Sequence, residues 1–213
     1  MSPLYAILDA DVARVRGLDP LALARALFAG GARLVQVRAK SLASGAYLDL
    51  CEAVVRAGAP HEALVVVNDR PDVARLAGAA GVHVGQDDLP VEAARRLAGP
   101  HALVGLSTHD AAQIAAGAAT SADYLAVGPV FGTRTKDTGC AAMGLDLVRH
   151  AVAAARGKPV VAIGGITLDT AAEAIAAGAA SVAVISDLLA TGDPEGRVRE
   201  YVRLLETIRG MEN

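Results

Sequence analysis

Short apolar runs alternate with helix-like segments along the chain. The runs are four or five residues long, and most are apolar at both odd and even positions. Strands that are covered on both faces show this pattern. One helix-like segment, 19–31, has a proline just inside its start and glycines at its end, which are common helix boundary signals. The apolar runs span residues 4–8, 33–37, 63–67, 81–84, 102–106, 123–127, 159–163 and 181–185.

Eight strand–helix units predict an α/β fold, a (β/α)₈ TIM barrel that forms a single domain over residues 1–213. The alternative is an open doubly wound sheet, which would usually need fewer strands. It would commonly carry a G-x-G-x-x-G fingerprint after its first strand, and none follows residues 4–8. In a TIM barrel the functional residues follow the carboxyl ends of the strands.

Composition and charge narrow the classes of function. The formal net charge is −3, so we expect no nucleic-acid partner. Cys51 and Cys140 have no metal-type spacing, and a reducing cytosol suits two such cysteines. The first residues lack the pattern of a signal peptide, and no apolar run is long enough to span a bilayer. We therefore expect a cytoplasmic protein without a membrane partner.

The second apolar run leads into the sequence QVRAK. Gln36, Arg38 and Lys40 share one parity, so they project to one side while the chain stays extended. An arginine fork and a flexible lysine ammonium suit a multiply charged anion. A solvated strand end would carry the same residue types, and the motif alone does not separate the two interpretations.

Acidic residues follow the third and fourth runs. Asn68 and Asp69 follow the third run, and Asp87 and Asp88 follow the fourth. Asp69 and Asp88 could meet across the barrel mouth, where two carboxylates among cations suit Mg²⁺. Capping of the two following helices is the alternative explanation.

The remaining strand ends predict a second anion site. Gly164 and Gly165 follow the seventh run and Ser186 follows the eighth. Loops after strands 7 and 8 form the usual phosphate site of this barrel, although a tight turn would also use paired glycines. Ser107, after the fifth run, could donate to a phosphate oxygen, whereas His83 is expected to be a buried histidine with satisfied hydrogen bonds.

The segment VFGTRTKDTG, 130–139, follows the sixth run and lies between the two predicted sites. It is long for a connection between a strand and a helix, and such loops at this face often clamp ligands. Two anion sites in one barrel indicate an enzyme that joins or splits two phosphorylated substrates.

Six fragments in order along nearly the whole chain resemble the thiamine-phosphate synthase family. They are QVRAK, VNDRPDVARLAGAAGVHVGQDDLP, VGLSTHD, ADYLAVGPVFGTRTK, VVAIGGIT and SVAVISDLL. The resemblance implies a transferase that joins hydroxymethylpyrimidine diphosphate to a hydroxyethylthiazole phosphate with Mg²⁺, releasing pyrophosphate and forming thiamine phosphate.

The resemblance also assigns a role to each matching position. The implied Mg²⁺ ligands are Asp69 and Asp88. The implied pyrimidine diphosphate contacts are Gln36, Arg38, Lys40, Asn68, Ser107 and Lys136. The implied thiazole phosphate contacts are Thr133, Arg134, Thr135, Gly165, Ile185 and Ser186. Arg38, Lys40 and Lys136 are the expected catalytic residues, because they would stabilise charge on the departing pyrophosphate.

Two positions depart from the family pattern. Ala39 stands where glutamate is common, and Cys140 where an aromatic residue is commoner. Ala39 has the opposite parity to Arg38, so we expect little effect from it. The sequence leaves open the effect of Cys140, whether the thiazole is carboxylated, and whether chains associate into a homo-oligomer.

Three other functions would suit a barrel with anion sites. A related thiazole tautomerase would not need the diphosphate and Mg²⁺ contacts, and a non-catalytic binder of thiamine precursors would not need them all. An aldolase or epimerase of the same fold would call for a Schiff-base lysine on a strand or for acid–base carboxylates. The complete set of charged contacts favours the synthase.

Overall fold

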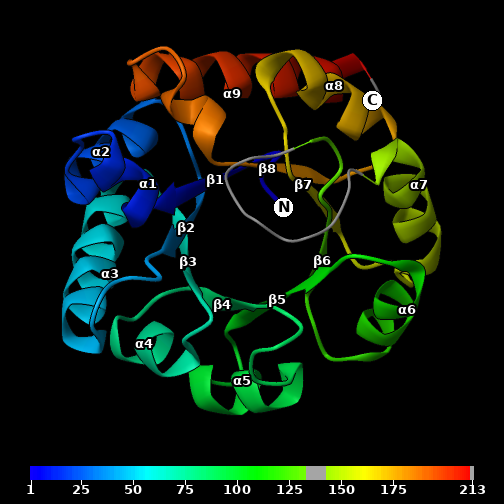
Figure 1. Cartoon of the computed structure of the whole chain (residues 1–213), viewed down its shortest axis with the longest axis horizontal. Coiled ribbons are helices and arrows are strands. Elements are labelled where there is room, and N and C mark those ends of the chain that lie inside the picture. Colours follow the sequence, from blue (N-terminus) through cyan, green and yellow to red (C-terminus); the bar gives the residue numbers. More distant parts are fainter. Residues whose placement is uncertain (133–142, 212–213) are drawn as a thin grey trace.

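Parallel strands close into a barrel in the computed structural model, which describes residues 1–132 and 143–211. Within these residues the strands follow one another around the barrel in chain order, from β1 to β8 (Figure 1). They are β1 Leu4–Asp9, β2 Leu34–Arg38, β3 Leu64–Asn68, β4 Gly81–Val84, β5 Leu103–Thr108, β6 Tyr124–Val127, β7 Val160–Ile163 and β8 Ser181–Val184. The predicted (β/α)₈ barrel is confirmed. The open sheet is excluded because β1 pairs with β8, Leu4 opposite Val182.

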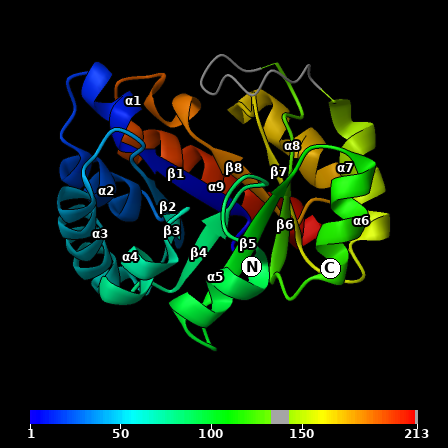
Figure 2. The ribbon, with the colours of Figure 1, turned by 60° about the horizontal axis from the view of Figure 1, so that its bottom comes forward.

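Helices surround the strands, as the two views show (Figures 1 and 2). They are α1 Ala10–Val15, α2 Pro20–Ala29, α3 Ser44–Gly58, α4 Pro71–Leu76, α5 Val91–Ala98, α6 Ala111–Ala119, α7 Gly144–Ala154, α8 Leu168–Ala176 and α9 Pro194–Met211. Two short 3₁₀ helices, η1 Ala59–His61 and η2 Ser186–Leu189, complete the described elements. None of the described helices is long and apolar enough to cross a membrane.

Local sequence signals explain where several helices begin. Asp19 caps α2 by accepting from the Ala22 amide, and Pro20 occupies the first turn. Asp110 caps α6 in the same way, through the Gln113 amide. The sequence pattern did not predict α1, which begins directly after β1 with Asp9 as its cap.

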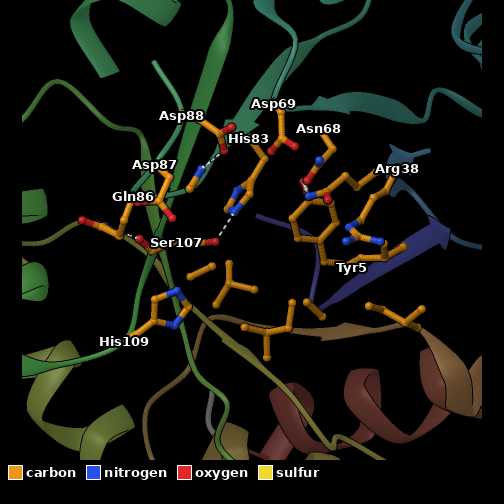
Figure 3. Close-up of a pocket in the computed structure, with 18 of the residues that line it drawn as sticks. Tyr5, Arg38, Asn68, Asp69, His83, Gln86, Asp87, Asp88, Ser107 and His109 are labelled. Atoms are coloured by element: carbon orange, nitrogen blue, oxygen red, sulfur yellow. Dashed lines mark hydrogen bonds between the residues drawn. The ribbon is translucent and has the colours of Figure 1, made fainter. Parts of the chain in front are cut away.

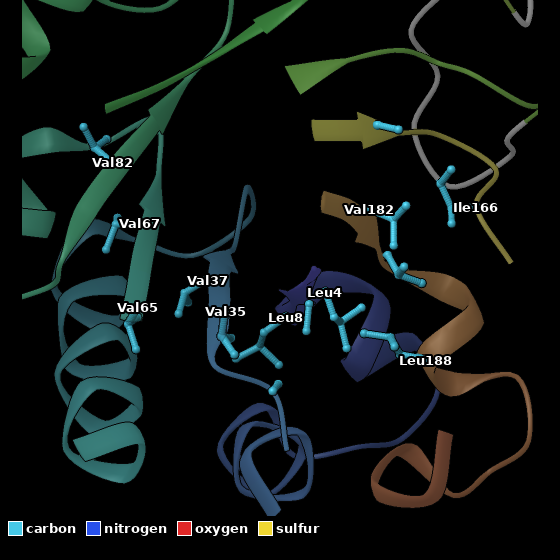
Figure 4. Packing of buried hydrophobic residues seen from close by; sticks show 14 of the residues in the cluster. Leu4, Leu8, Val35, Val37, Val65, Val67, Val82, Ile166, Val182 and Leu188 are labelled. Carbon is cyan, nitrogen blue, oxygen red and sulfur yellow. The ribbon is translucent and has the colours of Figure 1, made fainter. Parts of the chain in front are cut away.

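The main apolar core lies between the barrel and the helices. Outward-facing strand residues such as Leu8, Val35, Val67 and Val182 are fully buried there (Figure 4). A smaller cluster fills the barrel interior and includes Tyr5, Leu34, Val66, Tyr124 and Val161. Since both faces of each strand are buried, the runs are apolar at both parities.

Candidate active site

A cavity of about 480 Å³ opens at the carboxyl ends of the strands. Its size lies within the range of small-molecule binding sites. Figure 3 shows neighbouring Asp69 and Asp88 side chains, with Arg38 and Asn68 to one side and Ser107 and His109 to the other. The lining residues are Tyr5, Ile7, Gln36, Arg38, Lys40, Asn68, Asp69, His83, Gly85, Gln86, Asp87, Asp88, Ser107, His109, Gln113, Ala126, Val161, Ile163, Ala183 and Ile185. The mouth therefore collects most predicted site residues among the described positions.

The three alternating residues of β2 and its end all line the cavity, as their shared parity predicts. Gln36 lies inside the barrel and is buried. Arg38 forms an ion pair with Asp9, and Lys40 forms one with Asp69. Both cations are therefore held near the cavity by carboxylates. The Arg38–Asp9 pair is largely buried, so a freely solvated strand end does not account for Arg38.

Asp9 is a site residue that sequence reasoning missed. Its side chain is only 2% exposed. One carboxylate oxygen accepts from the backbone amides of Asp11 and Val12, both at 3.1 Å, while the other accepts from Arg38. Asp9 thus caps α1 and orients the Arg38 guanidinium at the same time. Its place at the carboxyl end of the first apolar run was the available signal.

Asp69 adopts an unusual backbone conformation at the end of β3. Its φ of 62° lies in the left-handed region, which is uncommon for residues other than glycine. Its amide donates to the His83 carbonyl at 2.8 Å. Helix α4 starts with Arg70 at the capping position and without a side-chain cap. Helix capping by Asp69 is therefore wrong as an explanation.

Asp88 shares the mouth with Asp69. Its carboxylate accepts from the Gly85 amide at 2.7 Å. Helix α5 has Pro90 at its capping position and no side-chain cap, so capping does not explain Asp88 either. Burial, together with the adjacent Asp69 carboxyl, raises the pKa of Asp88 above its ordinary value. Two carboxyls held this close favour a bound cation.

The donor set at this point fits a hard divalent ion. Among the described residues, no group of three or more His, Cys, Asp or Glu side chains forms a metal site, so a protein cage of the zinc type is absent from that part of the chain. Mg²⁺ commonly takes one or two carboxylates and completes its shell with water and phosphate oxygens. Asp69 and Asp88 match that requirement.

Tyr47 fixes the end of β3 from the helical side. Its buried hydroxyl lies 2.8 Å from the Val37 carbonyl oxygen and 3.2 Å from the Asn68 amide nitrogen. The same hydroxyl is 3.1 Å from the Asn68 carbonyl oxygen. Desolvation raises the pKa of Tyr47, so the hydroxyl remains a donor. Asn68 consequently has a fixed backbone where it lines the cavity.

A chain of polar side chains crosses the barrel interior. Gln36 Nε2 donates to Tyr5 Oη at 2.9 Å, and Tyr5 Oη lies 2.9 Å from Tyr124 Oη. Tyr124 Oη is 3.0 Å from His83 Nδ1, and His83 Nε2 is 2.8 Å from Ser107 Oγ. The expectation that His83 is a buried histidine with satisfied hydrogen bonds is confirmed. Burial raises the pKa of Tyr5 to about 12 and raises that of Tyr124 as well.

Sequence reasoning missed Tyr5 and Tyr124, which lie inside predicted strands. A hydroxyl on an inward-facing aromatic residue was the signal, because a buried tyrosine usually needs a hydrogen-bond partner. Gly105 makes the space for this contact. A Cβ there would lie 2.3 Å from Tyr124 Oη and 2.5 Å from His83 Nδ1.

The glycines after β7 have a packing role. Gly164 and Gly165 have φ values of 96° and 67°. A Cβ on Gly164 would lie 2.6 Å from Pro129 Cα, and one on Gly165 would lie 2.5 Å from the Gly132 carbonyl oxygen. The backbone after β6 therefore packs directly against this turn, which only residues without a side chain permit.

The predicted phosphate cradle is brought to the cavity in part. Ile185 lines the cavity, whereas Gly165 and Ser186 lie outside its described lining. Ser186 begins η2 directly after Ile185.

Ala39 belongs to the outer core, on the face opposite Arg38. The remaining predicted positions lie outside the described residues: Thr133, Arg134, Thr135, Lys136 and Cys140.

Comparison with known proteins relates this chain to one family. Residues 4–188 match the family model described as thiamine monophosphate synthase. A thiamine-phosphate synthase of Anaeromyxobacter dehalogenans is 49% identical over 85% of this chain and 81% of its own length. Another, of Koribacter versatilis, is 44% identical over 96% of each chain.

A solved structure agrees with these relatives. The thiamine phosphate pyrophosphorylase of Pyrococcus furiosus superposes with a TM-score of 0.87 at 28% identity, covering 97% of this chain and 96% of its own. The match extends over the strands that build the cavity. The chain belongs to the thiamine monophosphate synthase family.

Proposed function

We propose that this protein joins hydroxymethylpyrimidine diphosphate to a hydroxyethylthiazole phosphate, forming thiamine phosphate and releasing pyrophosphate. The observation that carries the proposal is the grouping of Arg38, Lys40, Asp69 and Asp88 around one cavity. A diphosphate with a divalent cation needs both charge types in one place. The family membership supports the same reaction.

The chemistry proposed is a dissociative displacement. The bond between the pyrimidine methylene carbon and the diphosphate oxygen breaks, and its electron pair leaves with pyrophosphate. The aminopyrimidine ring stabilises the resulting cation, and the thiazole nitrogen then forms the new bond with its lone pair. No nucleophilic side chain is required, so the protein acts by positioning and by stabilising charge.

Arg38, Lys40 and Lys136 are proposed to bind the diphosphate and to stabilise the negative charge that grows on it. Gln36, Asn68 and Ser107 would orient the pyrimidine diphosphate from the cavity wall. Asp9 holds Arg38 in place for this task. Lys40 pairs with Asp69 in the structure, so it lies close to the proposed metal ligands.

Asp69 and Asp88 are proposed to hold Mg²⁺, which would neutralise diphosphate charge as the leaving group departs. Support comes from the adjacent carboxyls and from the raised pKa of Asp88. A carboxyl with a raised pKa loses its proton more readily when a cation is bound nearby.

The thiazole phosphate is proposed to bind toward β7 and β8 and the segment after β6. Ile185 would contact the ring from the cavity wall, with Gly165 and Ser186 at the phosphate. Thr133, Arg134 and Thr135 would complete this contact.

One incubation tests the proposed reaction. The purified protein receives both phosphorylated substrates, with and without Mg²⁺, and pyrophosphate and thiamine phosphate are assayed together. We expect equal amounts of the two products, formed only with the cation. Absence of both products in the presence of Mg²⁺ would refute the proposal. Conversion of a thiazole tautomer without any diphosphate would instead identify a tautomerase.

The biological setting is proposed on the same basis. The partners are the two small-molecule substrates, with no nucleic acid or membrane partner, in the cytoplasm of the cell.

A further inference from the structure

The hydrogen-bonded polar side chains inside the barrel form one unbranched series, called the polar chain below. It runs from Gln36 through Tyr5, Tyr124 and His83 to Ser107, with links of 2.8 to 3.0 Å. These side chains come from β2, β1, β6, β4 and β5, so the chain ties opposite sides of the barrel together. Gln36 and Ser107, its two ends, both line the cavity.

Proton counting restricts how the links are arranged. A phenol carries one proton, and a neutral imidazole carries one N–H and one acceptor nitrogen. Both phenols keep their protons because burial raises the pKa of Tyr5 to about 12 and that of Tyr124 also. If Gln36 donates to Tyr5, then Tyr5 donates to Tyr124 and Tyr124 donates to His83 Nδ1. His83 then carries its proton on Nε2 and donates to Ser107.

This forward order fixes what each end offers to a ligand. One Gln36 N–H donates to Tyr5, so the amide oxygen is free of that contact and can accept from a ligand, beside the second N–H. Ser107 Oγ already accepts from His83, so its own proton is the one it can donate. The reverse order requires the Gln36 amide to be turned over, because only its oxygen can accept from Tyr5. The Gln36 NH₂ group is then the donor offered to a ligand, and Ser107, which donates to His83, offers only its oxygen. The hydrogen-bonding roles that Gln36 and Ser107 offer to a ligand therefore change together.

We propose that this chain is a specificity device that couples the two ends of the pyrimidine diphosphate site. A ligand that presents an amino donor to Gln36 and an anionic oxygen to Ser107 selects the forward order at both positions at once. Tyr5, Tyr124 and His83 are positioning residues in this scheme, because they act through Gln36 and Ser107. The inference rests on the proposed function, since an aminopyrimidine diphosphate carries both groups.

The position of the His83 proton is the first test. Nitrogen-15 NMR of the imidazole distinguishes the two neutral tautomers. In the complex with hydroxymethylpyrimidine diphosphate alone, where no transfer can occur, we expect the proton on Nε2. A proton on Nδ1 in that complex would overturn the proposal.

A thermodynamic cycle is the second test. Affinity for hydroxymethylpyrimidine diphosphate is measured by calorimetry for Gln36→Met, Ser107→Ala and the double variant. If the ends are coupled, the loss of affinity in the double variant falls short of the product of the two single losses by about fivefold or more. In a Tyr124→Phe background, the two losses of affinity should multiply to within about twofold, because the series of hydrogen bonds between Gln36 and Ser107 is interrupted.

Tyr201→Phe is the matched control for Tyr124→Phe. Tyr201 is also buried, and its hydroxyl donates to Asp187 at 2.6 Å on the outside of the barrel. The control should leave the coupling between Gln36 and Ser107 intact, and thermal unfolding of both variants checks that each still folds. Losses that multiply in the native background, or coupling that persists in Tyr124→Phe, would contradict the proposal.

Two results separate the coupling of Gln36 to Ser107 from the proposed reaction. If the native protein forms no pyrophosphate from both substrates, the proposed function fails, whatever the NMR result. If it does form pyrophosphate but His83 carries its proton on Nδ1 in the complex, only the coupling device fails.

Discussion

The two halves of the barrel mouth differ in chemistry. The half formed by β1 to β5 brings charged residues to the cavity, among them Arg38, Lys40, Asp69 and Asp88. Among the residues that the structure describes, the half formed by β6 to β8 lines it with Ala126, Val161, Ile163, Ala183 and Ile185. All eight strands are built from short, mainly apolar runs, so the difference arises mostly where each strand ends. One half suits a charged leaving group, and the other suits an uncharged ring.

The cations on the charged side of the mouth are paired with carboxylates. Arg38 pairs with Asp9 and Lys40 with Asp69. Lys40 has an ammonium-bearing side chain that is 54% exposed, whereas the Arg38 side chain is 18% exposed. Exposed pairs contribute little to stability because water and salt screen them. The Lys40–Asp69 pair can therefore rearrange readily when an anion and a cation enter.

Loss of a proposed metal ligand should produce the largest effect. Asp88→Asn should lower turnover by about a hundredfold or more, because the charge on the leaving group is then poorly neutralised. Steady-state rates across a range of Mg²⁺ concentrations measure the effect, and part of the loss should recover at high concentration. Asp72→Asn on α4, an exposed carboxylate paired with Arg70, is the matched control. Native turnover in Asp88→Asn would show that Asp88 is not needed to bind a catalytic Mg²⁺.

Lys136→Ala tests whether the segment after β6 adds a cation to the charged half. We expect turnover to fall by about a hundredfold while the fold is kept. Circular dichroism and single-turnover rates are the measurements. Lys158→Ala is the control, since Lys158 donates to the Thr120 and Ala122 carbonyls and does not line the cavity. Near-normal turnover in Lys136→Ala would refute its assigned role.

Asp9→Asn weakens the support of Arg38 without removing a predicted ligand contact. Asparagine can still cap α1, but the guanidinium loses its charged partner and its fixed position. A misplaced catalytic group can lower the rate by about tenfold to a hundredfold, and we expect turnover to fall within that range. Asp19→Asn, a substitution at the cap of α2, should leave turnover unchanged. Equal rates for both variants would show that Arg38 needs no partner.

Ile185→Ala addresses the apolar half and should have the smallest effect. The KM for the thiazole phosphate should rise about fivefold through lost apolar contact. The KM for the pyrimidine diphosphate should stay the same. Val152→Ala, on the exposed face of α7, is the control. If the pyrimidine diphosphate KM changed instead, the assignment of the two halves would be reversed.

The site was predictable from sequence where a strand end could be recognised. Gln36, Arg38 and Lys40 were found by parity, and Asp69 and Asp88 by following successive apolar runs. The resemblance to a family assigned their roles, which remain proposals. Asp9 was missed because its partner Arg38 is distant in sequence, and only the pairing of β1 with β2 places the two side by side. The reason for paired glycines was also hidden, because it depends on Pro129 and Gly132 packing against them.

The sequence by itself determined the eight-fold alternation and therefore the barrel. A strand buried on both faces needs an apolar run, and a helix needs apolar residues at helical spacing together with boundary residues. Both patterns can be recognised within a short stretch of sequence. Only the tertiary structure decided that Gln36, Tyr5, Tyr124, His83 and Ser107 form one chain. These residues are distant in sequence, and barrel closure alone brings inward-facing side chains from different strands within hydrogen-bonding distance.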